Sequence, residues 1–204
     1  MALIKHGKNA LSSVTAFPSA VPTGKPVLLS TATASASSSI EFTSGIDSTY
    51  DIYKWEFINI HAATDNTQLQ FNLSTDTGST YSVTKTSTHF FSYHSEDDAS
   101  TALGYSTSFD LAQSTGNQII TNGIGNGNDE SASGEMYLFS PSSDTFVKHF
   151  IVRTNTYYAS NWSIESFTAG YGNTTNPIDA VKFVMSSGNI DAGTIKMYGI
   201  SAWV

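Results

Sequence analysis

The feature that most constrains this chain is a succession of short β-branched and aromatic runs separated by turn-forming residues. The clearest run spans residues 68–73, where Leu69, Phe71 and Leu73 alternate with polar residues at the period of two that a half-buried strand requires. No window of eleven or more residues shows a convincing helical period with caps. These patterns predict an all-β chain.

Ten such runs are expected to form strands, at residues 27–33, 40–43, 52–61, 68–73, 89–93, 136–140, 146–153, 162–171, 180–185 and 194–200. In the third run the apolar side switches at Phe57 and Ile58, which indicates either a bulge or cover on both faces. Because no helices alternate with the strands, we expect residues 27–204 to form a single jelly-roll-like antiparallel β-sandwich.

Residues 1–26 differ from the rest of the chain. They hold three of its five prolines, a spacing that rules out a regular helix or a central strand. One interpretation is a leader without regular structure, and the other, which we favour, is an extended arm that packs on a neighbouring subunit. The apolar side chains available for such anchoring are Leu3, Ile4, Leu11, Val14 and Phe17.

The composition limits the classes of partner. A formal net charge of −8 with scattered cations disfavours nucleic acid and anionic lipid. No apolar run approaches the roughly 18 residues of a spanning helix, and the first ten residues lack the apolar segment of a secretion signal. The chain has no cysteine, which excludes a disulfide framework, a thiolate metal site and a cysteine nucleophile.

Three consecutive carboxylates, Glu96, Asp97 and Asp98, offer oxygen ligands of the kind that Ca²⁺ takes. A solvated turn is the commoner role of such a cluster, and the pattern matches no dedicated calcium loop, so no cofactor is predicted. The cluster begins the least strand-like stretch, residues 95–134, which we expect to form one or two long loops that carry function or subunit contacts.

No catalytic motif is recognisable in the chain. The histidines lack the pairing of a zinc protease, and no nucleophile elbow is present. A glycosidase would need two carboxylates at a defined separation, and Glu56, Glu135 and Glu165 are strand-borne candidates. A solvent-facing strand glutamate is far commoner than a catalytic one, so we expect the protein not to be an enzyme.

Tyr157, Tyr158 and Trp162 cluster near a predicted loop, beside Asn155 and Asn161. An aromatic ring can stack on the face of a sugar while amides bond its hydroxyls, so these three rings are a candidate carbohydrate platform. The alternative is that they fill the core or a subunit interface.

A series of short segments carries a resemblance to a known group. The segments are Ile-Glu-Phe-Thr-Ser-Gly-Ile-Asp-Ser-Thr-Tyr at 40–50, Tyr-Lys-Trp-Glu-Phe at 53–57, Asn-Ile-His at 59–61, Leu-Phe-Ser-Pro-Ser at 138–142, Val-Lys-His-Phe at 147–150, Ser-Gly-Asn-Ile at 187–190 and Gly-Thr-Ile-Lys-Met-Tyr-Gly-Ile at 193–200. Over residues 36–200 the chain resembles a widespread group of virion structural proteins of tailed bacteriophages, especially marine and cyanobacterial ones. The closing segment at 193–200 is the most specific.

The resemblance implies a virion protein that is assembled in the host cytoplasm as a homo-oligomer, typically a trimer, and is attached to other virion proteins by its N-terminal segment. It implies no catalytic residue. We expect a tail-associated short fibre, adhesin-like protein or adaptor whose loops face host surface glycan or neighbouring subunits. One alternative is a capsid decoration or cement protein that stabilises the head lattice, and another is an enzyme that degrades envelope polysaccharide.

Overall fold

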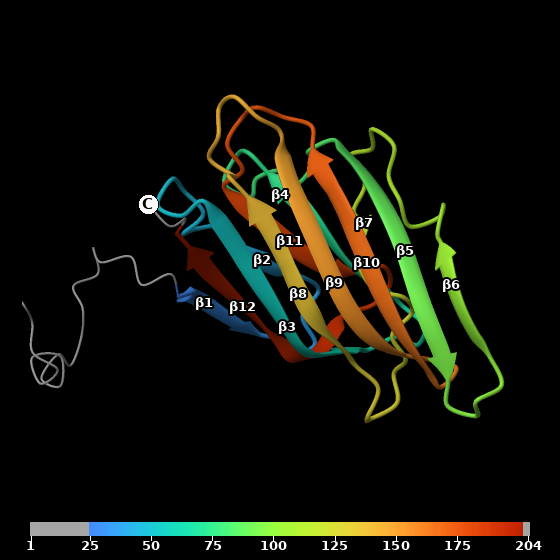
Figure 1. Cartoon of the computed structure of the whole chain (residues 1–204). Coiled ribbons are helices and arrows are strands. Elements are labelled where there is room, and N and C mark those ends of the chain that lie inside the picture. Colours follow the sequence, from blue (N-terminus) through green and yellow to red (C-terminus); the bar gives the residue numbers. More distant parts are fainter. Residues whose placement is uncertain (1–24, 202–204) are drawn as a thin grey trace, which may run out of the picture.

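The computed structural model describes residues 25–201, and within this range the chain forms strands and no helix (Figure 1). The strands are β1 (Val27–Thr33), β2 (Ile40–Phe42), β3 (Ile52–Ala62), β4 (Leu69–Ser74), β5 (Lys85–Ser95), β6 (Thr101–Tyr105), β7 (Gln118–Ile119), β8 (Ala132–Phe139), β9 (Lys148–Tyr158), β10 (Trp162–Gly172), β11 (Ala180–Met185) and β12 (Ile190–Ile200). The prediction of an all-β chain is confirmed.

Two antiparallel sheets pack face to face as a sandwich. The large sheet has the order β1-β12-β3-β8-β9-β10-β5-β6, and the small sheet, which lies behind it in Figure 1, has the order β2-β11-β4-β7. The predicted sandwich is therefore present, while its jelly-roll character stays a prediction. The arm residues Leu3, Ile4, Leu11, Val14 and Phe17 lie outside the described residues.

The core lies between the two sheets and is rich in aromatic rings. Trp55 of the large sheet is fully buried, and its ring lies 6.3 Å from that of Phe42 and 6.2 Å from that of Phe183, both in the small sheet. Further along, Phe71 and Phe150 meet edge to face at 5.0 Å. Each of these side chains occupies the inward position of an alternating strand, so burial of apolar area holds the sheets together.

The predicted switch of apolar side in β3 is a bulge. The register of β3 against β8 shifts between Phe57 and Ile60, and Asn59 adopts a positive φ of 49°. The extra residue turns Ile60 back into the core, where it is fully buried, and leaves Ile58 38% exposed. The switch of apolar side in β3 is therefore due to a bulge and not to cover on both faces.

Two expectations about local structure were wrong. Asn72 was expected to face solvent, but it is buried because residues 114–117 cover it, and its Nδ2 donates to the carbonyl of Thr115. The stretch 95–134 is not loop throughout, since it contains β6 and β7. Strand β6 escaped prediction because it lies at the sheet edge, and an edge strand with little burial shows no alternation.

One face of the large sheet is turned away from the small sheet, and we refer to it as the outer face. In β9, Phe150 and Val152 are buried, whereas Ile151 and Arg153 point to the outer face. Because paired residues in neighbouring strands share a face, the strand pairing places one row of outer-face side chains straight across the sheet. This row consists of Thr31, Lys196, Glu56, Glu135, Arg153, Phe167, Phe90 and Tyr105.

Candidate functional site

The predicted aromatic residues lie at the turn between β9 and β10. Tyr158 and Trp162 are cross-strand partners with ring centroids 5.5 Å apart. Trp162 also stacks on Tyr93 of β5, at 4.5 Å and an interplanar angle of 11°. Tyr157 is displaced from this stack, because neighbouring residues of a strand point to opposite faces, and it lies opposite Ser163. The structure thus joins two of the three predicted rings and adds Tyr93, which the sequence did not single out.

A small pocket lies at this end of the large sheet, and we call it the hairpin-end pocket. Its volume is about 250 Å³. It brings Tyr157 and Trp162 of the candidate carbohydrate platform together with Glu96 of the carboxylate cluster. It is lined by His94, Ser95, Glu96, Asn155, Thr156, Tyr157, Trp162 and Ser163.

The polar groups of the hairpin-end pocket are held in place from both sides. The backbone N–H of Glu96 donates to the carbonyl of Asn161 at 3.0 Å, which ties the loop after β5 to the β9–β10 turn. A hydrogen bond with Glu96 raises the pKa of the Tyr157 hydroxyl, and Asn155 Nδ2 donates to Ser163 Oγ at 3.0 Å. Amide, hydroxyl and carboxylate groups therefore line the same pocket as Trp162 and Tyr157, and polar groups beside aromatic residues are a combination suited to sugar binding.

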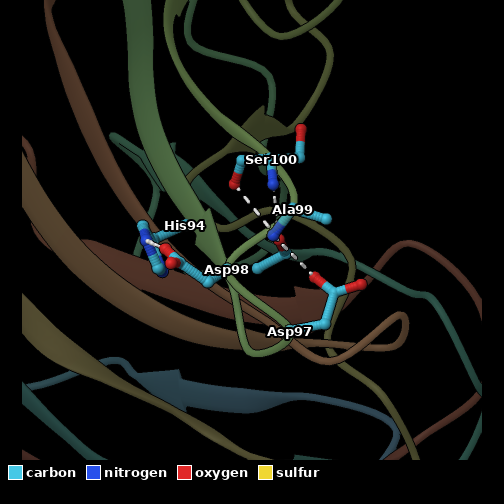
Figure 2. A network of polar contacts seen from close by, with 6 residues as sticks. His94, Asp97, Asp98, Ala99 and Ser100 are labelled. Atoms are coloured by element: carbon cyan, nitrogen blue, oxygen red, sulfur yellow. Dashed lines mark hydrogen bonds and ion pairs between the residues drawn. The ribbon is translucent and has the colours of Figure 1, made fainter.

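The three carboxylates considered as candidate calcium ligands, Glu96, Asp97 and Asp98, do not converge. Asp98 Oδ1 lies 3.1 Å from His94 Nε2, whereas Asp97 points the other way and its Oδ1 accepts a hydrogen bond from the backbone N–H of Ala99 (Figure 2). A hydrogen bond with Ser95 lowers the pKa of Asp97. Within residues 25–201, no group of three or more His, Asp or Glu side chains is arranged to hold a metal ion.

The tight loop after β5 explains why these carboxylates diverge. Ser95 and Ser100 close it, since the Ser100 N–H donates to Ser95 Oγ at 2.9 Å and the Ser95 N–H donates to the Ser100 carbonyl at 2.9 Å. Asp98 takes a left-handed backbone with φ 57°, as turn residues of this type tolerate. Asp97 accepts a hydrogen bond within the turn, and Asp98 contacts His94. Of the three carboxylates, only Glu96 lines the hairpin-end pocket.

The strand glutamates that were weighed as a glycosidase pair contact cations, and two of them, Glu56 and Glu135, lie in the outer-face row. Lys54 Nζ lies 2.9 Å from Glu56 and 2.9 Å from Glu135, and Glu165 pairs with Arg153. The hydrogen bond from Lys54 lowers the pKa of Glu56. Although burial alone would lower the pKa of Lys54, its bonds to Glu135 and Glu56 raise it.

A second hollow, the apolar groove, lies on the outer face over Gly170. It has a volume of about 490 Å³. The groove is lined by Thr86, Ser87, Thr88, His149, Phe150, Ile151, Ala169, Gly170 and Tyr171. No periodicity in the sequence marks it, because it depends on which strands become neighbours.

Fold and site together define a two-sheet antiparallel β-sandwich with a polar and aromatic pocket at one end of its large sheet. No family model matches the chain, and no curated protein or solved structure is similar to it. In the part of the chain that the structure describes, no helix is long and apolar enough to cross a membrane.

Proposed function

We propose that this chain is a structural protein of a tailed-bacteriophage particle, a tail-associated short fibre, adhesin-like protein or adaptor that assembles as a homo-oligomer, with a trimer as the expected form. The virion assignment rests on the resemblance of the segments in residues 36–200. The assembly role is supported by one observation, the exposed apolar side chains on strands of the large sheet: Val27, Leu28, Ile58, Phe90, Leu103, Tyr105 and Ile151. Phe90 and Tyr105 are cross-strand partners at the β5–β6 edge, and neighbouring exposed apolar side chains mark interaction surfaces.

The hairpin-end pocket supports the adhesin-like role. Two aromatic residues, Tyr157 and Trp162, line this hollow together with Glu96 and Asn155. A pocket of about 250 Å³ at one end of the sheet suits one or two sugar units of a surface glycan. We therefore propose that this end of the sandwich faces the host, and that the N-terminal segment attaches the protein to other virion proteins.

The location is tested by labelling intact particles with an antibody against the chain and imaging them by electron microscopy. Label confined to the tail is the expected result. Label spread over the capsid would instead support the alternative, a decoration or cement protein of the head. Particles without label would overturn the virion assignment altogether.

Glycan binding is tested with the purified full chain and host envelope polysaccharide. The parent is expected to bind and to compete with phage adsorption, while Trp162→Ala loses binding and Tyr157→Phe weakens it, since the latter removes only one hydroxyl. Phe146→Ala is the matched control, because Phe146 is an exposed aromatic residue outside the pocket. Equal binding by all variants would exclude this pocket, and release of reducing sugar ends by the parent would support the enzyme alternative.

A further inference from the structure

We infer that strand β6 pairs with the β6 strand of a second copy of this chain, antiparallel and about a two-fold axis at Leu103, so that the large sheet continues from one copy into the next. The inference concerns the free chain and does not depend on the virion assignment. It rests on the backbone groups that β6 leaves free, on a contrast between β6 and the other sheet edges, and on the side chains that the pairing brings together.

Alternate backbone groups of β6 point away from β5. The residues that flank β6, Ser100 and Ser106, both make backbone hydrogen bonds to β5, which fixes the phase of the ladder on both sides of the strand. Hydrogen-bonded and non-hydrogen-bonded pairs alternate in an antiparallel ladder, so Ala102 and Gly104 also bond to β5. Strand β6 is the last strand of the large sheet among the described residues (Figure 1). The open edge therefore presents the N–H and C=O groups of Thr101, Leu103 and Tyr105.

Strand β6 differs from the other sheet edges in lacking protection against strand addition. Natural proteins protect a free edge with a charge, a proline, a bulge or a very short strand. Within residues 25–201, the other three edges have such features: β1 follows Lys25 and Pro26 and has a bulge after Leu28, β2 has three residues and carries Glu41, and β7 has two residues. Strand β6 has five residues, no charge, no proline and no shift of register against β5. Its edge is therefore open to another strand.

The side chains of β6 suit pairing with a second copy of the same strand. With Leu103 opposite Leu103 of the second copy, Thr101 lies opposite Tyr105, and every free N–H and C=O group of the three residues has a partner. Leu103 is 76% exposed and Tyr105 52% exposed, so the pairing covers apolar surface. A β-branched residue opposite an aromatic one is also a favourable cross-strand pair. A two-fold axis brings any charge on the strand close to its own copy, and β6 carries none although the chain has a net charge of −8.

The contact is small, since β6 has five residues. Interfaces well below the standard size belong to weak and reversible associations, so the pair is expected to dissociate on dilution. The trimer of the proposed function would use another contact, because a two-fold axis joins subunits in pairs. Where both contacts form, the chain is expected as a hexamer in which β6 edges join two trimers.

Sedimentation equilibrium of the full chain tests the pairing, at concentrations between about 10 μM and about 1 mM. The parent and the control Phe146→Lys are expected to reach an even multiple of the chain mass. Leu103→Lys is expected to halve it, because two ammonium groups would face each other across the axis. Leu103 and Phe146 are 76% and 70% exposed, so neither substitution changes a core position. A parent that stays monomeric or trimeric up to about 1 mM would overturn the inference, as would an oligomer that Leu103→Lys leaves intact.

Engineered cysteines test the register, because the chain has no cysteine of its own. In the full chain carrying both Thr101→Cys and Tyr105→Cys, each thiol lies opposite the other kind in the second copy, and mild oxidation is expected to give a covalent dimer on non-reducing gels.

Thr101→Cys alone is the control for the register. Its thiol and that of the second copy would lie four residues apart along the strands, about 14 Å, which is too far for a disulfide. Failure of the double variant to form a covalent dimer, or equal cross-linking by the single variant, would overturn the pairing. Either failure leaves the virion location untouched, since that is tested on particles.

Discussion

Lys85 Nζ donates a hydrogen bond of 2.6 Å to Asn72 Oδ1, and this contact joins the large sheet to the small one. Both side chains are buried, and the ammonium also donates to the carbonyl of Val83 at 2.8 Å. No carboxylate contributes to its environment, and burial lowers the pKa of Lys85 to about 8. The sandwich therefore carries a buried cation held by neutral acceptors.

Protein stability should consequently rise between pH 8 and pH 10.5. The folded-state pKa of Lys85 lies below its unfolded value, so the unfolded chain binds more protons in this window and loses that advantage as the pH increases. The gain amounts to roughly 3 kcal/mol over the full window. Urea unfolding at pH 7.5, 8.5 and 9.5 measures it. Lys85→Met should remove the rise and Lys25→Met should retain it; a rise that survives in Lys85→Met would assign it to another group.

His89 should make the fold sensitive to acid. It is fully buried, its Nδ1 lies 2.8 Å from Thr168 Oγ1, and burial lowers its pKa to about 4. As the pH falls from 6.5 to 4, His89 binds a proton in the unfolded chain but not in the folded chain. The free energy of unfolding therefore decreases, by roughly 2 kcal/mol at pH 5. His89→Gln is expected to flatten this loss in urea titrations. His149→Gln, at an exposed position in the same sheet, should behave as the parent does.

Lys148 ties two loops together at one end of the sandwich. Its buried ammonium donates to the carbonyls of Ser143 and Phe146, at 2.6 and 2.7 Å, and to those of Thr174 and Thr175, at 3.3 and 3.4 Å. Lys148→Met would leave these acceptors without their donor, at a cost of about 3 kcal/mol. Hydrogen exchange should speed up in residues 140–147 and 173–177 together. Lys196→Met, on the outer face, should change neither loop.

Gly193 should tolerate no side chain. Its φ is 113°, and a Cβ there would lie 2.5 Å from the carbonyl oxygen of Asn59, which is the bulged residue of the partner strand β3. Gly193→Ala is therefore expected to destabilise the fold by roughly 2 kcal/mol or more in thermal unfolding. Gly116→Ala is the matched control in a loop, since its φ is not positive and its nearest contact is a serine hydroxyl. Equal stability of both variants would show that the bulge adapts.

The strands themselves could be predicted because the alternation of apolar and polar residues along each strand follows which of its side chains are buried. In β4, Leu69, Phe71 and Leu73 alternate and are all fully buried, and β11 begins and ends at the predicted residues, 180 and 185. The switch at Phe57 and Ile58 also marked where the bulge lies, although the sequence left cover on both faces open as the alternative; one extra residue is enough to reverse the apolar side of a strand. These signals are local, so they can be read without knowing which strands become neighbours.

The buried polar groups and the site could not be predicted in the same way. Nothing near Lys85 in the chain marks it as buried, because its cover and its partner Asn72 come from other parts of the sequence. The hairpin-end pocket likewise depends on β5 lying beside β10, which brings Glu96 to Tyr157 and Trp162. Of the three carboxylates at 96–98, the turn geometry alone determines that one faces the pocket.

The sequence by itself therefore determined the fold class, most strand positions and the switch of apolar side in β3, because alternation, turn residues and β-branched runs act over a few residues. Only the tertiary structure decided that the large sheet has eight strands with an open outer face, where the hairpin-end pocket and the apolar groove lie, and that Lys85, His89 and Lys148 are buried. The physical reason is that strand order and sheet packing bring together residues far apart in the chain, and no local pattern encodes those pairings.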